Sequence, residues 1–169
     1  RGKTTLMKLL LGELPYAGRI QSDVNFVYFP QTIVDKTQLT KFILDELYDA
    51  PDWQIHRELN LLGLPEDILW RPFDTLSGGE QTKVLLAGLF LDEANFPLID
   101  EPTNHLDVAS RAKIANYLKR SKSGYIVVSH DRQFLDEVTD HLLAIERNGL
   151  ELIAANFSTY EQQKKQRDD

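Results

Sequence analysis

The chain has 169 residues, of which 42% are hydrophobic and 27% are charged, a balance typical of a globular domain with a sizeable core. It contains no cysteine, which excludes disulfide bonds and thiolate metal sites. The formal net charge is −7, so the overall field does not attract nucleic acid and we expect no DNA partner. The uncharged apolar run at residues 84–91 is far too short to cross a bilayer, so we expect no direct membrane insertion.

The beginning of the chain predicts a helix followed by a strand. Leucines at helical spacing follow Thr4 and Thr5, and Gly12 and Pro15 are typical of the end of a helix. Apolar residues alternate through the stretch at 24–30, which predicts a strand that ends at a proline.

The run from residue 32 to residue 91 predicts helices with no strand between them. Helical periodicity occupies residues 39–50 and 53–65, and a third helix begins at Ser77. Ser77 and Glu80 have the spacing of a capping box, in which each side chain bonds the backbone N–H of the other residue. We expect residues 32–91 to form a helical subdomain inserted into a sheet.

Strands and helices alternate in the second half of the chain, and this alternation predicts an α/β fold with a mostly parallel sheet. Pro97 is an awkward member of its strand because it cannot donate to a ladder of hydrogen bonds. The predicted elements are a strand at 95–100, a helix at 108–122, a strand at 125–130, a helix at 132–140, a hairpin at 141–154 that turns at Asn148 and Gly149, and a polar, helix-prone tail at 156–169.

Gly78 and Gly79 stand in the first turn of the helix that begins at Ser77, where each costs roughly 1 kcal/mol relative to alanine. The capping box does not explain them. Bare N–H groups and the positive end of a helix dipole suit an anion such as phosphate. We therefore expect a group to approach these two glycines so closely that no side chain is tolerated.

Three residues at the start of the chain match the end of a phosphate-binding loop. Gly2, Lys3 and Thr4 fit the last three positions of the P-loop motif, which lies between a strand and a helix. In that motif the lysine reaches β- and γ-phosphate oxygens and the hydroxyl ligates Mg²⁺. Such a tripeptide also arises by chance, but the helix predicted directly after it supports the assignment.

Two carboxylates end an apolar strand, where a parallel sheet presents groups to a ligand: Asp100 and Glu101. An aspartate there can hold Mg²⁺, and a second carboxylate beside it can act as general base towards a water molecule. The alternative is that the pair forms an acidic cap on the next helix, a role that Asp107 fills better.

Gln31 and His130 end two further predicted strands. Either residue alone is more often a solvated or structural side chain. Their shared position at strand ends, beside the P-loop residues and the acidic pair, favours a common site. His56 and His141 belong to no such arrangement, so we expect them to be structural, and the four histidines lack the spacing of a metal site.

The order of these motifs resembles the nucleotide-binding domain of ATP-binding cassette (ABC) proteins. The end of Walker A, the Q-loop, the signature "LSGGEQ", Walker B, the D-loop and the switch histidine follow one another along residues 1–154. The resemblance implies an N-terminally truncated P-loop NTPase cassette at 1–154, the start of an interdomain linker helix at 155–169, and ATP and Mg²⁺ as cofactors. It assigns ATP binding to Gly2, Lys3, Thr4, Thr5, Gln31, Ser77, Gly78, Gly79, Gln81 and Asp107, metal binding to Thr4, Gln31 and Asp100, and catalysis to Glu101 and His130.

In ABC proteins two cassettes face each other and sandwich two ATP molecules. The resemblance therefore implies that Gly78 and Gly79 are small because ATP held by a second cassette approaches their backbone. "EPTNHLD" (residues 101–107) and the polar tail are similar to the ABC-F group, soluble proteins with two cassettes on one chain that act on ribosomes. This similarity implies a cytoplasmic ATPase that closes as a clamp on the ribosome, either as a translation factor or as one of the antibiotic-resistance members that protect the ribosome from drugs.

Two other interpretations remain open. One is the nucleotide-binding subunit of an ABC membrane transporter, against which "EPTNHLD" and the polar tail weigh. The other is a nucleotide-sensing module that closes on ATP and barely turns over, against which Asp100, Glu101 and His130 weigh together. Because the first part of Walker A is not in the chain, we expect the 169 residues alone to hydrolyse almost no ATP and the intact parent to be an ATPase.

Overall fold

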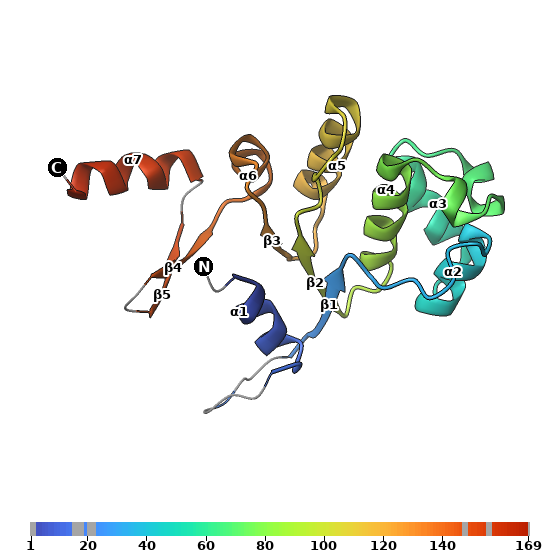
Figure 1. Cartoon of the computed structure of the whole chain (residues 1–169), viewed down its shortest axis with the longest axis horizontal. Helices are drawn as coiled ribbons and strands as arrows, with labels where there is room; N and C mark the ends of the chain where they lie inside the picture. Colours follow the sequence, from blue (N-terminus) through green and yellow to red (C-terminus); the bar gives the residue numbers. More distant parts are fainter. Residues whose placement is uncertain (1–2, 15–18, 20–22, 147–148, 155–156, 169) are drawn as a thin grey trace.

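A parallel sheet of three strands organises the chain, and it lies at the centre of the view in Figure 1. The computed structural model describes residues 3–14, 19, 23–146, 149–154 and 157–168. Strand β2 (Asn95–Asp100) is central, with β1 (Asn25–Phe29) on one side and β3 (Ile126–Val128) on the other, and both pairings are parallel. The α/β fold with a mostly parallel sheet is therefore confirmed.

The helices follow the predicted order, with two short additions. Two 3-10 helices that the pattern did not predict, η1 and η2, follow Pro65 and Pro72. The helices are α1 (Lys3–Leu10), α2 (Thr40–Leu47), α3 (Asp52–Leu61), η1 (Glu66–Trp70), η2 (Phe73–Thr75), α4 (Gly78–Leu89), α5 (Val108–Arg120), α6 (Arg132–Val138) and α7 (Phe157–Asp168).

The two faces of the sheet carry different side chains, because neighbouring residues of a strand point to opposite faces. Phe29 and Ile99 are paired across β1 and β2, are buried, and belong to the main hydrophobic core with residues of α4, α5 and α6. Tyr28 and Leu98, the preceding pair, therefore point to the opposite face, on the side where Figure 1 shows α1. Asp100 shares that face with Leu98 because it lies two residues further along β2.

Pro97 is buried in the central strand, where a proline is unusual. It is paired with Val27 of β1, but the pairing of β2 with β3 begins one residue later, at Leu98. Within the described residues, β2 therefore has a neighbouring strand on only one side at Pro97, the side of β1. The absence of its N–H is tolerated there because no ladder with β3 passes through it.

The helices between β1 and β2 pack on the face of the sheet that carries Phe29. The capping box at the start of α4 is confirmed: the Ser77 hydroxyl accepts from the N–H of Glu80 at 3.1 Å, and the Glu80 carboxylate accepts from the N–H of Ser77 at 2.9 Å. Every residue from Val84 to Leu89 is buried, so α4 runs through the core. The division into an inserted subdomain and a linker stays a prediction.

The end of the chain forms a hairpin and a polar helix. Strands β4 (Leu142–Glu146) and β5 (Gly149–Ile153) pair antiparallel, as predicted, and of the predicted turn residues Asn148 lies outside the described residues. Helix α7 is held to α6 by polar contacts, among them Arg132 with Glu161 at 2.8 Å. Figure 1 shows α7 at the edge of the view, beyond α6.

A buried hydrogen bond joins α3, which belongs to the predicted subdomain, to α5, which packs on the sheet. The Tyr117 hydroxyl donates to the Glu58 carboxylate, and both residues are 7% exposed. Burial, followed by this hydrogen bond, raises the pKa of Tyr117, so the phenol stays protonated and acts as the donor. Arg57 supplies a second partner to Glu58 at 3.2 Å.

We expect Tyr117→Phe to lower the free energy of unfolding by about 1–3 kcal/mol, because it removes the donor and leaves a buried carboxylate oxygen unsatisfied. Urea denaturation measures this change. Glu58→Gln is the matched variant: the amide oxygen still accepts from the phenol, so the loss should be smaller. Equal urea midpoints for Tyr117→Phe and the unchanged protein would contradict a stabilising role for this bond.

Candidate functional site

Asp100 lies at the carboxyl end of β2, where its carboxylate is held by a residue that the sequence patterns did not single out. The Tyr28 hydroxyl donates to Oδ2 of Asp100 at 2.7 Å. Burial, followed by the hydrogen bond to Asp100, raises the pKa of Tyr28 to about 12, so the phenol is protonated at neutral pH. The parallel pairing of β1 and β2 could have suggested this contact, but only after the register was known.

Glu101 and His130, the two residues predicted to be catalytic, are in direct contact. The Nδ1 atom of His130 contacts Oε1 of Glu101, and the backbone N–H of His130 donates to Oε2 at 3.3 Å. The N–H of Glu101 donates to the carbonyl of Val128 at 2.8 Å, which ties the end of β2 to the end of β3. Both carboxylate oxygens of Glu101 are therefore held by one residue, whose side chain is 87% exposed.

The backbone of Glu101 is in the left-handed region, with φ of 49°. A residue with a side chain costs roughly 1–2 kcal/mol there, and such conformations cluster at functional sites. The bond from the Glu101 N–H to Val128 and the buried residues on either side of this turn hold the conformation. This conformation places the carboxylate beyond the end of the strand, at the carboxyl edge of the sheet.

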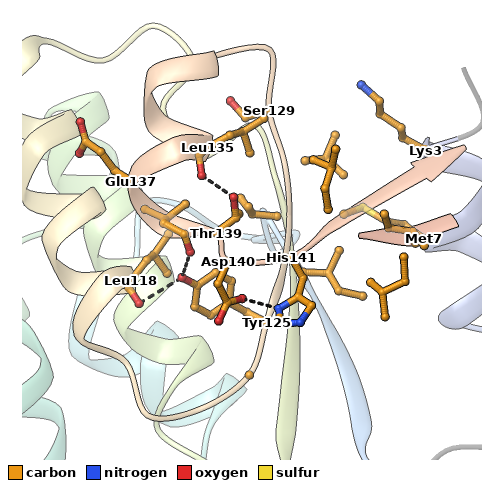
Figure 2. Close-up of a pocket in the computed structure, with 18 of the residues that line it drawn as sticks. Lys3, Met7, Leu118, Tyr125, Ser129, Leu135, Glu137, Thr139, Asp140 and His141 are labelled. Atoms are coloured by element: carbon orange, nitrogen blue, oxygen red, sulfur yellow. Dashed lines mark hydrogen bonds and ion pairs between the residues drawn. The ribbon is translucent and has the colours of Figure 1, made fainter. Parts of the chain in front are cut away.

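A large cavity of about 770 Å³ lies beside β3, and Lys3 is the described P-loop residue that lines it. Lys3, the first residue of α1, lines it together with Ser129, the residue before His130. Figure 2 shows Lys3 and Met7 on one side of this cavity and Leu118 and Tyr125 on the other. Gly2 lies outside the described residues, nothing is described of the Thr4 side chain, and Thr5 is exposed on α1.

The residues present fit a magnesium ion that is bound together with substrate phosphates. They do not fit a metal ion whose ligands are all protein side chains. No group of three or more histidine, cysteine, aspartate or glutamate residues in the described part of the chain could hold a metal ion. Mg²⁺ uses one or two carboxylates together with waters and substrate phosphates. Asp100 supplies such a carboxylate next to the cavity that Lys3 lines, because Asp100 is paired with Val128, which also lines it.

Gln31, predicted to bind ATP and the metal, has its side chain turned towards the helices. Its Nε2 donates to the carbonyl of Leu85 in α4 at 3.0 Å and contacts the hydroxyl of Tyr48. Its Oε1 is buried and has no hydrogen-bond partner among the described residues. The ring of Tyr48 packs against Gly88 of α4 and occupies the space that a Cβ at position 88 would need. The structure does not bring Gln31 to Asp100, since α4 and Tyr48 supply its partners.

The two glycines of the signature have different surroundings within this chain. A Cβ on Gly79 would lie 2.5 Å from Oγ and 3.2 Å from Cβ of Ser110, whereas a Cβ on Gly78 would meet nothing within 4 Å. Gly79 is therefore required by packing within the chain. The space at Gly78 is open. That another molecule approaches the backbone of Gly78 and Gly79 stays a prediction for both residues.

Asp107 caps α5 and thereby fixes Ser110. Its carboxylate accepts from the N–H of Ser110 at 3.0 Å, and hydrogen bonds from the hydroxyl and the N–H of Ser110 hold the pKa of Asp107 below its usual value. This is the helix cap that the sequence predicted. The N–H of Ser110 is held by Asp107, so the Ser110 backbone that carries the Oγ atom beside Gly79 is fixed at the start of α5.

The other signature residues serve α4 itself in this structure. Ser77 is its N-cap, and Nε2 of Gln81 donates to the carbonyls of Phe73 and Leu76 at 3.2 Å and 3.1 Å. Gly78, Gln81 and Gln31 line a second cavity of about 510 Å³, together with residues 104–106. This cavity shares no lining residue with the one at Lys3, so the predicted ATP-binding residues form two separate groups.

The two histidines expected to be structural each pair with a carboxylate, and the pair of His141 and Asp140 lines the cavity at Lys3 (Figure 2). His56 lies 3.5 Å from Glu66, and His141 lies 2.9 Å from Asp140. Three residues that matter to the site carried no sequence signal of their own: Tyr28, Tyr48 and Ser110. Each contacts a site residue that lies far away in the sequence: Tyr28 contacts Asp100, Tyr48 contacts Gln31, and Ser110 lies beside Gly79. Only the tertiary structure therefore identifies them.

We expect Gly79→Ala to lower the free energy of unfolding by about 1–3 kcal/mol, the usual effect of overpacking, and Gly78→Ala to leave it unchanged or slightly higher. Urea denaturation of the two variants makes the comparison. Adding Ser110→Ala to Gly79→Ala should restore part of the loss, because it removes the oxygen at 2.5 Å. Equal losses for the two alanine variants would show that the contact with Ser110 does not decide the residue at 79.

Within the described part of the chain, no helix has both the length and the apolar character needed to cross a membrane. A family model described as "ABC transporter" matches residues 1–104. The ATP-binding protein YdiF of Bacillus subtilis (strain 168) is 36% identical over 171 residues, which cover 96% of this chain and 26% of that protein. ATP-binding cassette sub-family F member 3 of Homo sapiens is 31% identical over 166 residues, which cover 94% of this chain and 23% of that protein.

Solved structures show the same likeness. The structure of a complex of the archaeal ribosomal stalk protein aP1 and the archaeal ribosome recycling factor aABCE1 contains a chain with a TM-score of 0.68 and 32% identity, covering 84% of this chain and 29% of that chain. The chain spans about a quarter of the length of the curated relatives that it matches. The match in both sequence and fold shows that the chain belongs to the ATP-binding cassette family, in which its relatives include members of the F sub-family.

Proposed function

We propose that this chain is a cassette that binds and hydrolyses ATP in an ABC-F type protein, and that its closure on a second cassette acts as a clamp on the ribosome. The observation that carries the proposal is the position of Glu101. Its carboxylate lies at the carboxyl edge of the sheet, directly after Asp100 and in contact with His130. A general base next to a metal-binding carboxylate at this edge suits nucleotide hydrolysis.

The residues predicted to bind ATP and Mg²⁺ would have different tasks. Lys3, with Gly2 and Thr5, would bind the phosphates, and the N-terminal end of α1 favours their negative charge. Asp100, Thr4 and Gln31 would hold Mg²⁺, which neutralises charge on the phosphates when it is bound. Gln31 would have to leave Leu85 and Tyr48 to do so, and its unpartnered Oε1 favours such an exchange of partners.

Glu101 would take the proton of the attacking water at Oε1, the atom that the ring of His130 now contacts. The ring must therefore turn away before the water can approach. Because the side chain of His130 is largely exposed, little packing opposes that movement. In its new position the ring would bind the γ-phosphate, and the backbone N–H of His130 would still orient Glu101 through Oε2.

The second cassette would meet this chain at the open side of α4. Gly78 leaves space beside its backbone, and the N–H groups of the first turn suit the phosphates of ATP carried by a facing domain. Four residues would support this contact from within the chain. Ser77 and Gln81 hold the signature turn and Asp107 caps α5, whereas Gly79 leaves room for Ser110 of α5.

The ribosome is proposed as the partner because of the proteins to which this chain is similar. One similar structure is that of a ribosome recycling factor, and the sequence relatives include F sub-family members. The net charge of −7 implies that contact with a ribosome uses a local patch or a ribosomal protein rather than the overall field of the chain. Protection of the ribosome from antibiotics is a narrower form of the same proposal, and a drug-protection assay with ribosomes would test it.

We expect Glu101→Gln in the full-length protein to abolish ATP turnover and to leave ATP binding in place, because the amide cannot accept the proton. Steady-state phosphate release and nucleotide binding are measured side by side. Glu93→Gln, an exposed glutamate on the turn between α4 and β2, removes the same charge and should have no effect. Near-normal phosphate release from Glu101→Gln would reject Glu101 as the general base.

We expect the Glu101→Gln protein to sediment with purified ribosomes when ATP is present and to remain in the supernatant without it, because a cassette that cannot hydrolyse ATP stays closed. Phosphate release should be absent in the same samples. No ATP-dependent sedimentation with intact ribosomes would contradict the ribosome clamp and would favour the transporter subunit instead.

A further inference from the structure

We propose that Tyr28 is a positioning residue for the metal site: its hydroxyl fixes one oxygen of Asp100 so that the other oxygen faces the metal ion. The inference rests on the proposed function, because it concerns the Mg²⁺ that accompanies ATP. It names a residue of β1 that no motif of the sequence contains.

The register places the two side chains on the same face of the sheet. Tyr28 is paired with Leu98 in the parallel ladder of β1 and β2. Asp100 lies two residues beyond Leu98 and therefore points to the same face. A residue at this diagonal position is too far for a short side chain but within reach of a tyrosine. Phe29, the next residue of β1, points into the opposite core and could not replace it.

The hydrogen bond restricts the carboxylate to one orientation. The Tyr28 hydroxyl donates to Oδ2 of Asp100 at 2.7 Å, the short distance typical of a bond from a hydroxyl to a carboxylate. No hydrogen bond to Oδ1 is present within the described ranges of the chain. Rotation of the carboxylate would break the bond to Tyr28, so Oδ1 is kept as the oxygen available to a ligand.

The position of the pair agrees with this role. Asp100 is paired with Val128, and Val128 and Lys3 both line the large cavity that runs along β3. Groups that hydrogen-bond a metal-binding carboxylate set its orientation, and their removal typically weakens metal binding about 10-fold to 100-fold. Tyr28 is such a group for Asp100. It does not itself touch the nucleotide or the metal in this arrangement.

The test measures metal binding without turnover. Mn²⁺ replaces Mg²⁺ as the probe, in complex with the non-hydrolysable analogue AMP-PNP, and electron paramagnetic resonance measures the Kd for Mn²⁺ in the full-length protein. Asp100→Asn identifies which Mn²⁺ site this chain contributes. Tyr28→Phe keeps the ring and removes the hydroxyl, and should raise the Kd for Mn²⁺ at that site about 10-fold or more. Its affinity for AMP-PNP in EDTA should be unchanged.

Tyr117→Phe is the matched control, because it removes another hydroxyl that donates to a carboxylate, in the buried contact between α3 and α5. It should lower stability and leave the Kd for Mn²⁺ unchanged. An unchanged Kd for Tyr28→Phe overturns the inference, and so does a parallel loss of AMP-PNP binding in EDTA, which would indicate a purely structural role. If the unchanged protein has no Mn²⁺ site that Asp100→Asn removes, the proposed function fails and the inference fails with it.

Discussion

The parallel pairing of β2 with β1 and β3 is the constraint on which the rest of the structure depends. It brings together the ends of three segments that lie far apart in the sequence, at Phe29, Asp100 and Val128. The N–H of Glu101 continues the ladder one residue beyond the strand by donating to Val128. The strained backbone of Glu101 and its contact with His130 both follow from that bond, because it fixes where the chain turns away from the sheet.

A helix cap links the signature to the rest of the cassette. Asp107 caps α5 and holds Ser110, and Ser110 occupies the space beside Gly79. The cap at the start of α5 thus sets how closely the start of α4 can approach it. This gives a packing reason for glycine at position 79, whereas the surroundings of Gly78 within the chain are open.

Two of the residues proposed to meet ATP and Mg²⁺ are bound to protein partners instead. Gln31 is held by Leu85 and Tyr48, and His130 contacts Glu101. Asp100, in contrast, is held by Tyr28 on one oxygen only. Under the proposed function, the metal-binding carboxylate is oriented before the nucleotide arrives, whereas Gln31 and His130 exchange partners when it binds. Movement of the helices that carry Tyr48 and Leu85 would then be coupled to occupancy of the site.

The sequence by itself determined the elements whose cause is local. The periodicity of the helices, the capping box at Ser77, the cap at Asp107 and the hairpin of β4 and β5 all depend on residues close together in the chain, and all are present as predicted. It also placed Asp100 and Glu101 at the end of a strand, because an apolar run followed by carboxylates is visible in one dimension. The family followed from the order of such motifs.

Only the tertiary structure decided which side chains meet. The hydrogen bond from Tyr28 to Asp100, the contact of Gly79 with Ser110, and the attachment of Gln31 to α4 join residues that no local pattern connects. Each depends on strand register or on the packing distance between helices, which is set by the whole core rather than by neighbouring residues. A period of two or 3.6 residues tells which face a side chain occupies, and the packed fold alone tells what lies against that face.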